Sequence, residues 1–189
     1  GHYADSLSEA KGYGFDIQHT FDFKTFAQKR NDEIDRLNGI HLSLLEKAGV
    51  ELIMGHAAFK DDHTVTVDGQ DYTADHFVIA VGGTPTVPEI EGAEHMITSD
   101  GVWQLDSLPK SMVVWGGGYI GVEFASIFQS LGTEVTVVIR RQNVLAGFDE
   151  EISTFLQDEM TKRGIQFITD DTIEHVTTNK DGVKTAHLK

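Results

Sequence analysis

The chain has 189 residues and carries 15 basic against 30 acidic side chains, a formal net charge of −15 at pH 7. This acidic balance disfavours nucleic acid and anionic membranes as partners, because both need a basic surface, and no apolar run approaches the roughly 18 residues of a membrane span. The chain has no cysteine, which excludes thiol catalysis, disulfides, thiolate zinc and iron–sulfur clusters within it. We therefore predict a cytoplasmic protein of one large or two small domains, with no metal site.

The first half of the chain predicts a long helix followed by strands. Gly1–Lys11 resembles the end of a helix. Residues 23–48 are predicted as the longest helix, because the members of one stripe recur in it at spacings of three and four: Ile34, Leu37, His41, Leu44 and Ala48. Three strands are predicted next, at Val50–Phe59, Thr64–Asp68 and Phe77–Val81, with a turn at Asp68–Gly69. Pro85 and Pro88 then indicate a crossing between domains.

The second half of the chain predicts alternating strands and helices. After a short helix near Ser99–Leu105, the predicted elements are a strand at Met112–Trp115, a helix at Tyr119–Leu131, a strand at Glu134–Arg140, a helix from the cap Asp149 to Arg163, and a strand at Ile165–Thr169. The tail from Thr172 to Lys189 is predicted as two strands around a turn at Asp181–Gly182. Such alternation indicates the α/β class, with a parallel sheet built from right-handed βαβ units.

A glycine-rich sequence lies between the first of these strands and its helix. Gly116, Gly118 and Gly121 form the pattern G-x-G-x-x-G. The first glycine permits a tight turn, the second lets a pyrophosphate approach the backbone, and the third lets helix and strand pack closely. The helix N-terminus adds free N–H groups and a positive dipole. In this context the pattern indicates a dinucleotide site, against the alternative of a turn that contains glycines by chance.

The end of the next strand indicates which dinucleotide binds. Proteins that bind NAD usually place a carboxylate there, about 20 residues after the turn, to accept the ribose 2′-hydroxyl. Here Arg140 and Arg141 occupy that place, and no acid follows until Asp149. A guanidinium binds a 2′-phosphate that a carboxylate would repel. NADP is therefore favoured over NAD, and the alternative is a pair of solvated surface arginines.

Five segments resemble, in the same order, the flavin-dependent pyridine nucleotide–disulfide oxidoreductases, and among these the glutathione reductases in particular. They are RLNGI at 36–40, GHAAF at 55–59, IAVGGTP at 79–85, ITSDG at 97–101 and GGGYIGVEFA at 116–125. The resemblance implies a Rossmann-like NADP-binding domain at residues 89–189, lacking its last strand. It implies that residues 1–88 are the C-terminal half of the first segment of a Rossmann-like FAD-binding domain.

The resemblance also implies an activity. The chain would be the central segment of an NADPH- and FAD-dependent disulfide reductase, with glutathione disulfide as the favoured small-molecule substrate and a homodimer as the whole protein. Hydride would pass from NADPH through FAD to a redox disulfide that lies outside this chain. The chain alone is therefore expected to be inactive, because it has no cysteine.

Individual residues receive roles from the same resemblance. Tyr119 and Glu123, which share a helix face, would gate and position the nicotinamide. The alternative is that Glu123 only complements the helix dipole and Tyr119 is a surface aromatic. The NADP contacts would be Gly116, Gly117, Gly118, Ile120, Gly121, Glu123, Arg140 and Arg141. The FAD contacts would be His56, Ala57, Ala80, Val81, Gly82, Ser99 and Asp100. His41 stands where glutathione reductases often have a substrate-contacting tyrosine, so it is the predicted substrate residue. The alternative is a core histidine, because His41 lies on the apolar stripe of its helix.

Departures from the family pattern leave alternatives open. Ala146 stands in place of the second arginine for the 2′-phosphate, and Val81 replaces a threonine and removes its hydroxyl. The alternatives are a related disulfide or mercuric reductase, and a stand-alone NADP-binding module without redox activity. The missing cysteines fit the module, but the flavin-side segments do not.

Overall fold

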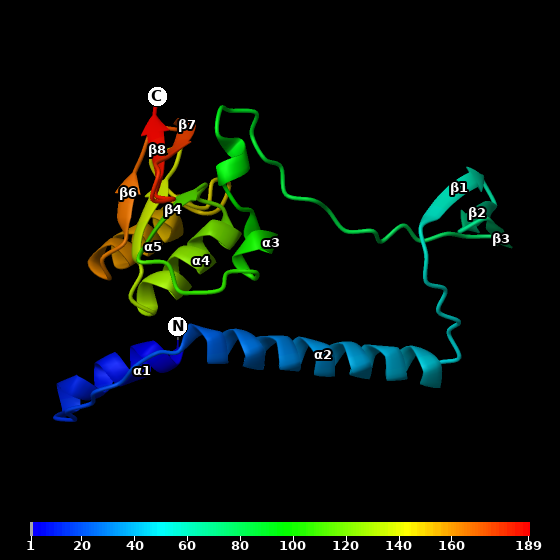
Figure 1. Cartoon of the computed structure of the whole chain (residues 1–189), viewed down its shortest axis with the longest axis horizontal. Helices are drawn as coiled ribbons and strands as arrows, with labels where there is room; N and C mark the ends of the chain where they lie inside the picture. Colours follow the sequence, from blue (N-terminus) through cyan, green and yellow to red (C-terminus); the bar gives the residue numbers. More distant parts are fainter. Residues whose placement is uncertain (1) are drawn as a thin grey trace. The chain divides into compact units, whose positions relative to one another are not determined.

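The computed structural model describes residues 2–189 and shows a mixed α/β chain that divides into two compact units (Figure 1). The first unit contains the residues up to Ala27 together with Pro85–Lys189, and the second contains Gln28–Thr84. The second unit ends close to the predicted crossing, whereas the domain boundary at residue 88 stays a prediction.

A parallel three-stranded sheet forms the centre of the first unit. Its strands are hydrogen-bonded in the order β4-β5-β6, with bounds Ser111–Trp115, Glu134–Val138 and Gln166–Ile168. Helix α4 connects β4 to β5 and helix α5 connects β5 to β6, with bounds Tyr119–Ser130 and Glu150–Lys162. Parallel neighbours need such crossovers, because a tight turn cannot join them. The predicted α/β alternation is confirmed.

The ends of the two helices follow from local chemistry. Helix α5 begins after Asp149, whose carboxylate accepts the backbone N–H groups of Glu151 and Ile152 at 3.0 and 3.2 Å. Both helices end beside glycines with positive φ, 100° at Gly132 and 99° at Gly164. The predicted cap and both predicted stops are confirmed.

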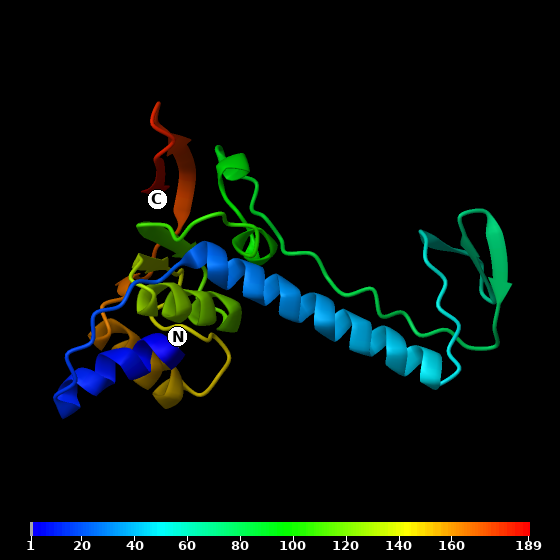
Figure 2. The ribbon, with the colours of Figure 1, turned by 60° about the horizontal axis from the view of Figure 1, so that its bottom comes forward.

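Both faces of the parallel sheet are covered. Val135 and Val137 of β5 are buried in the main core with residues of α4 and α5. Val138 faces the other way and packs with Ile173 and Val176. Those two residues belong to β7 (Ile173–Thr178), which pairs antiparallel with β8 (Lys184–Leu188), so the predicted strand–turn–strand tail is confirmed. Figure 2 shows this hairpin in orange and red and α4 in yellow-green. Burial on both faces explains why the consecutive residues Val137 and Val138, which point to opposite faces of β5, are both apolar.

Shorter elements complete the first unit. They are α1 (His2–Ala10), η1 (Lys11–Tyr13), η2 (Ala93–His95) and α3 (Ser99–Val102). Gly92, before η2, has φ = 80°, and a Cβ there would lie 1.9 Å from the carbonyl oxygen of Val176. Only glycine therefore lets this segment lie against β7, where the Val176 N–H donates to Glu91 at 2.9 Å.

The second unit contains most of helix α2 and an antiparallel sheet. Helix α2 spans Phe23–Lys47, as predicted, and Phe23 at its start is buried in the core of the first unit. The sheet has the order β1-β2-β3, with bounds Ala57–Asp61, Thr64–Val67 and Gln70–Thr73. Asp68 and Gly69 join β2 to β3 with φ of 48° and 89°, so the predicted turn is confirmed as a two-residue hairpin turn.

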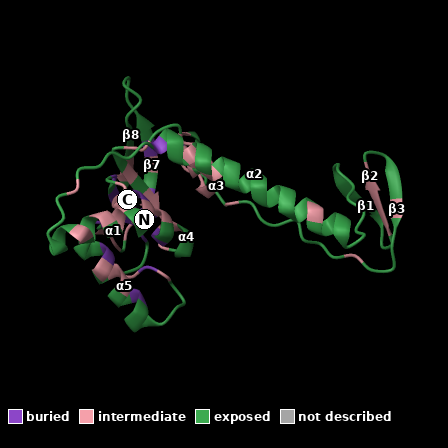
Figure 3. Ribbon diagram, turned by 90° about the horizontal axis from the view of Figure 1, so that it is seen from below, coloured by how far each residue is buried: buried purple, intermediate pink, exposed green. Residues whose placement is uncertain are grey.

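Two predicted strands are wrong in whole or in part. Of Val50–Phe59, only the residues from Ala57 form a strand, and Phe77–Val81 forms none. A strand needs a hydrogen-bonding neighbour, and within residues 2–189 no strand pairs with residues 77–81. Val78 and Val81 are accordingly 92% and 89% exposed. Figure 3 shows the same contrast, because the second unit is green apart from pink segments such as β2 and contains no residue in purple.

Candidate functional site

The glycine-rich turn joins the carboxyl end of β4 to α4. Gly116 has φ = 123°, which L side chains rarely adopt, and its N–H donates to the carbonyl of Val138 at 3.0 Å. A Cβ at Gly121 would lie 2.4 Å from the carbonyl oxygen of Gly116, whereas around an added Cβ at Gly118 no heavy atom beyond its chain neighbours lies within 4 Å. The turn is thus packed tightly at Gly121 and open at Gly118, which fits a bound pyrophosphate.

The first turn of α4 presents the predicted nicotinamide and phosphate contacts. The first N–H groups of a helix have no acceptor within the helix, so they are available to an anion beside Gly118. Tyr119 is 62% exposed, Ile120 is 43% exposed, and Glu123 is exposed one turn further on. The structure therefore leaves these three side chains accessible from solvent.

Arg140 and Arg141 follow β5 after a single residue, Ile139. Residues Trp115 and Val138 are partners at the ends of β4 and β5, so the arginines leave the same edge of the sheet as the glycine turn. Both are exposed, and neither side chain forms an ion pair or hydrogen bond with another residue of 2–189. Two cationic groups thus stand at the carboxyl edge of a parallel sheet, where ligands of such sheets bind. Ala146 is also exposed and adds no charge.

The segment after β5 is joined to the glycine turn. A Cβ at Gly117 would lie 2.8 Å from Cγ2 of Ile139 and 3.2 Å from Cα of Val144. The N–H of Leu145 donates to the carbonyl of Gly117 at 2.6 Å. Gly117 therefore allows the two loops to touch, which is a packing role in addition to its predicted nucleotide contact.

Sequence reasoning missed the residue that holds this segment from the other side. The side-chain amide of Gln157, on α5, bonds to the backbone of both Gln142 and Val144. A single glutamine on a helix matches no motif and no periodicity, so no signal in the sequence could have identified it.

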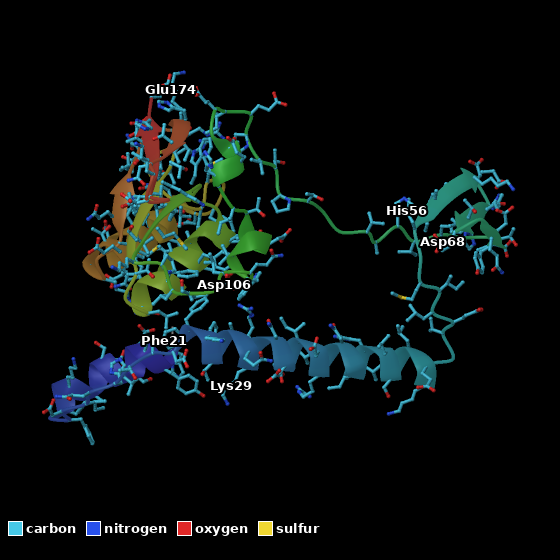
Figure 4. The ribbon with its side chains drawn as sticks, viewed as in Figure 1. Phe21, Lys29, His56, Asp68, Asp106 and Glu174 are labelled. Carbon is cyan, nitrogen blue, oxygen red and sulfur yellow. The ribbon has the colours of Figure 1, made fainter. Side chains whose placement is uncertain are left out.

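The predicted FAD contacts fall in different parts of the chain. Ser99 and Asp100 lie in α3, in the first unit. The other five lie in the second unit and are all exposed: His56, Ala57, Ala80, Val81 and Gly82. Figure 4 shows His56 at the same end of the antiparallel sheet as Asp68. A surface hollow of about 550 Å³ in this unit includes none of the five. The FAD contacts therefore stay a prediction.

His41 lies on α2 and is exposed. The stripe predicted around it is exposed as well, with Ile34 at 47%, Leu37 at 40% and Leu44 at 55%. The substrate role of His41 and the alternative of a core histidine both stay predictions. Over the same residues, no helix is long and apolar enough to cross a membrane, and no three His, Asp or Glu side chains converge as metal ligands would.

The fold and the turn define a dinucleotide-binding protein of the Rossmann type. The model of the family described as pyridine nucleotide-disulphide oxidoreductase matches residues 3–189. The chain belongs to this family.

Its similarity to individual members is also high. Over 184 residues it is 41% identical to a glutathione reductase of Nostoc sp. (strain PCC 7120 / SAG 25.82 / UTEX 2576). This alignment covers 97% of this chain and 40% of the relative. Over 182 residues it is 42% identical to the chloroplastic/mitochondrial glutathione reductase of Pisum sativum. This alignment covers 95% of this chain and 33% of the relative. The chain thus spans about two fifths or less of these relatives.

The fold of the chain is also similar to those of solved flavoprotein disulfide reductases. The HOCl-induced flavoprotein disulfide reductase RclA from Escherichia coli matches with a TM-score of 0.78 and 26% identity, over 88% of this chain and 41% of that one. A Cu(II) complex of its C43S mutant matches with a TM-score of 0.80.

Proposed function

We propose that this chain is the central segment of a longer NADPH- and FAD-dependent disulfide reductase whose substrate is a small disulfide, glutathione disulfide being favoured. One observation carries the proposal: beside a glycine turn that is open at Gly118 lie two arginines whose side chains have no partner within residues 2–189. The relatives named glutathione reductase support the choice of substrate.

The nucleotide part of the proposal assigns a role to each group at the sheet edge. The backbone at Gly118 and the first N–H groups of α4 bind the pyrophosphate. Arg140 binds the 2′-phosphate through charge-assisted hydrogen bonds, with Arg141 beside it in place of an arginine at Ala146. NADPH, once bound, supplies a hydride. Tyr119 and Glu123, exposed on one face of α4, gate and orient the nicotinamide.

The flavin part rests on family membership rather than on a formed site. The five exposed residues of the second unit would contact FAD only with further sheet strands beside residues 77–81. We propose that the longer protein supplies those strands, the redox cysteines and the homodimer interface, and that it is cytoplasmic. A stand-alone NADP-binding module is the second candidate, because the chain has no cysteine.

Calorimetric titration of the 189-residue chain tests the nucleotide part. We expect NADPH to bind more tightly than NADH, and Arg140→Ala to weaken NADPH by about tenfold or more while leaving NADH unchanged, because a charge-assisted hydrogen bond contributes about 1.5–3 kcal/mol. Arg141→Ala should act in the same direction and more weakly.

Arg163→Ala is the matched control. This arginine is also exposed in the first unit, but its guanidinium lies 3.7 Å from Asp5, beyond the C-terminal end of α5. It should not alter the preference for NADPH. Equal losses of NADPH and NADH in Arg140→Ala would contradict the assignment. Measured turnover of the longer protein with glutathione disulfide, other disulfides and mercuric ion would then decide between a glutathione reductase and its relatives.

A further inference from the structure

The segment that carries the arginines, residues 140–146, has no helix or strand to fix its backbone. Leu145 has φ = 54°, in the left-handed region that a branched side chain rarely adopts. Such a conformation persists only where the surroundings enforce it. Val144 is 1% exposed within the main core, and the Leu145 N–H bonds to Gly117. One side of the segment is therefore fixed by the glycine turn.

Helix α5 fixes the other side. Oε1 of Gln157 accepts the N–H of Val144 at 3.0 Å, and Nε2 of the same amide donates to the carbonyl of Gln142 at 3.0 Å. One turn away, Oγ1 of Thr154 accepts from Nδ2 of Asn143 at 3.0 Å. A single side-chain amide thus bonds to the backbone on both sides of Asn143, and Gln142 is the residue directly after Arg141.

We propose that Gln157 is a positioning residue for 2′-phosphate recognition. Its amide holds residues 142–144 so that the two arginines stay at the edge of the glycine turn. The inference rests on the proposed NADPH site. Arg140 and Arg141 have no side-chain partner of their own within residues 2–189, so their placement depends on the backbone that carries them.

Selectivity follows from this arrangement. A site that is held in its binding geometry loses less conformational freedom when the ligand arrives. Freeing the segment should therefore weaken the ligand that uses the arginines. NADH has no 2′-phosphate and needs only the turn and the start of α4, with which the Gln157 side chain forms no hydrogen bond within residues 2–189. Gln157 should thus contribute to the preference for NADPH without touching the nucleotide.

The test is Gln157→Met in the 189-residue chain, which removes both hydrogen bonds and keeps the length of the side chain. We expect the Kd for NADPH to rise by about three- to tenfold and the Kd for NADH to change by less than about twofold. Thr154→Val, which removes only the contact with Asn143, should raise the Kd for NADPH by about twofold. This second variant keeps the inference testable if the first folds poorly.

Gln129→Met is the matched control. The Gln129 amide also donates to a backbone carbonyl, that of Arg163, but at the C-terminal end of α5. The Gln129→Met variant loses a side-chain to backbone hydrogen bond of the same kind and should leave the ratio of the Kd for NADPH to the Kd for NADH unchanged. Amide hydrogen exchange is the second readout: exchange at residues 142–145 should accelerate in Gln157→Met and stay unchanged in Gln129→Met.

Each outcome decides the matter. Parallel losses of NADPH and NADH, or faster exchange with an unchanged Kd, would overturn the positioning role. If Arg140→Ala abolishes the preference for NADPH and Gln157→Met does not reduce it, the positioning role of Gln157 is wrong and the proposed function stands. If the unmodified chain shows no preference for NADPH, both the proposed nucleotide site and the positioning role of Gln157 are wrong.

Discussion

Replacement of Gly121 by alanine should destabilise the first unit. The added Cβ would lie 2.4 Å from the carbonyl oxygen of Gly116 and 3.3 Å from Cγ1 of Val114. The first contact is with backbone, and Gly116 is itself held by its N–H bond to Val138 at 3.0 Å. The turn therefore cannot yield without loss of that bond or of the packing between α4 and β4.

The magnitude can be worked out from these contacts. Forced insertion of a methyl group costs about 1–3 kcal/mol, and the loss of one hydrogen bond costs about 1 kcal/mol more. Alanine regains up to about 1 kcal/mol of helix propensity, because Gly121 lies within α4. The net loss is about 1–3 kcal/mol, which corresponds to a fall in Tm of roughly 3–15 °C for a unit of this size.

Thermal unfolding followed by circular dichroism measures the effect, and two other glycines serve as controls. Gly39 lies within α2 with nothing within 4 Å of an added Cβ, so Gly39→Ala should leave the Tm unchanged or raise it slightly. Gly118→Ala should also keep its Tm, because Gly118 has φ = −72° and open space, yet it should lose NADPH binding. A Gly121→Ala variant as stable as the unmodified chain would contradict the predicted steric clash. Full NADPH affinity in Gly118→Ala would contradict the predicted approach of the pyrophosphate to Gly118.

Three further predictions concern the rest of the chain. The 189-residue chain with added FAD and glutathione disulfide should consume no NADPH above a heat-killed control, because it has no cysteine to accept electrons; steady glutathione production would contradict this. In the longer protein, His41→Ala should raise the KM for glutathione disulfide and spare NADPH-driven flavin reduction, measured by stopped-flow absorbance; joint loss of both would remove the substrate role. The Thr25 hydroxyl, 2.6 Å from the Asp22 carboxylate, holds the pKa of Asp22 below its ordinary 3.8. Since the folded pKa is the lower one, this contribution to α2 is present above pH 3.8 and lost as the pH falls through the folded pKa; Asp22→Asn should abolish that part of the acid transition in helicity.

The parts of the fold that sequence could predict are those fixed by local chemistry or by two-sided burial. Asp149 caps α5 through its own carboxylate, and Asp68–Gly69 forms its turn from residues that tolerate positive φ. The valines of β5 are buried on both faces, and the consecutive apolar residues Val137–Ile139 indicate such two-sided burial from sequence alone. Each of these signals is complete within a few residues, so no distant partner was needed to interpret it.

The candidate site likewise contains residues that the sequence could identify and one that it could not. The glycine turn was predictable because its three glycines answer separate steric demands, and those at Gly118 and Gly121 are met in the structure. Gln157 was not predictable, because its contacts cross 13 and 15 residues of chain and depend on how α5 packs. The roles of Tyr119, Glu123 and the FAD contacts stay predictions, since family resemblance rather than geometry assigns them.

The wrong prediction at Phe77–Val81 has a physical cause that bears on function. Its apolar run is typical of a buried strand, and such a run specifies burial without specifying the partner. Val78, Ile79 and Val81 are 92%, 70% and 89% exposed, so the burial that their side chains call for is not met within residues 2–189. The segment includes Ala80 and Val81 and leads into Gly82, which the family resemblance places against FAD. The lack of a neighbouring strand thus accounts for the absent strand at residues 77–81, and the flavin contacts predicted beside it stay a prediction. The predicted nucleotide contacts, by contrast, lie beside a parallel sheet that is covered on both faces.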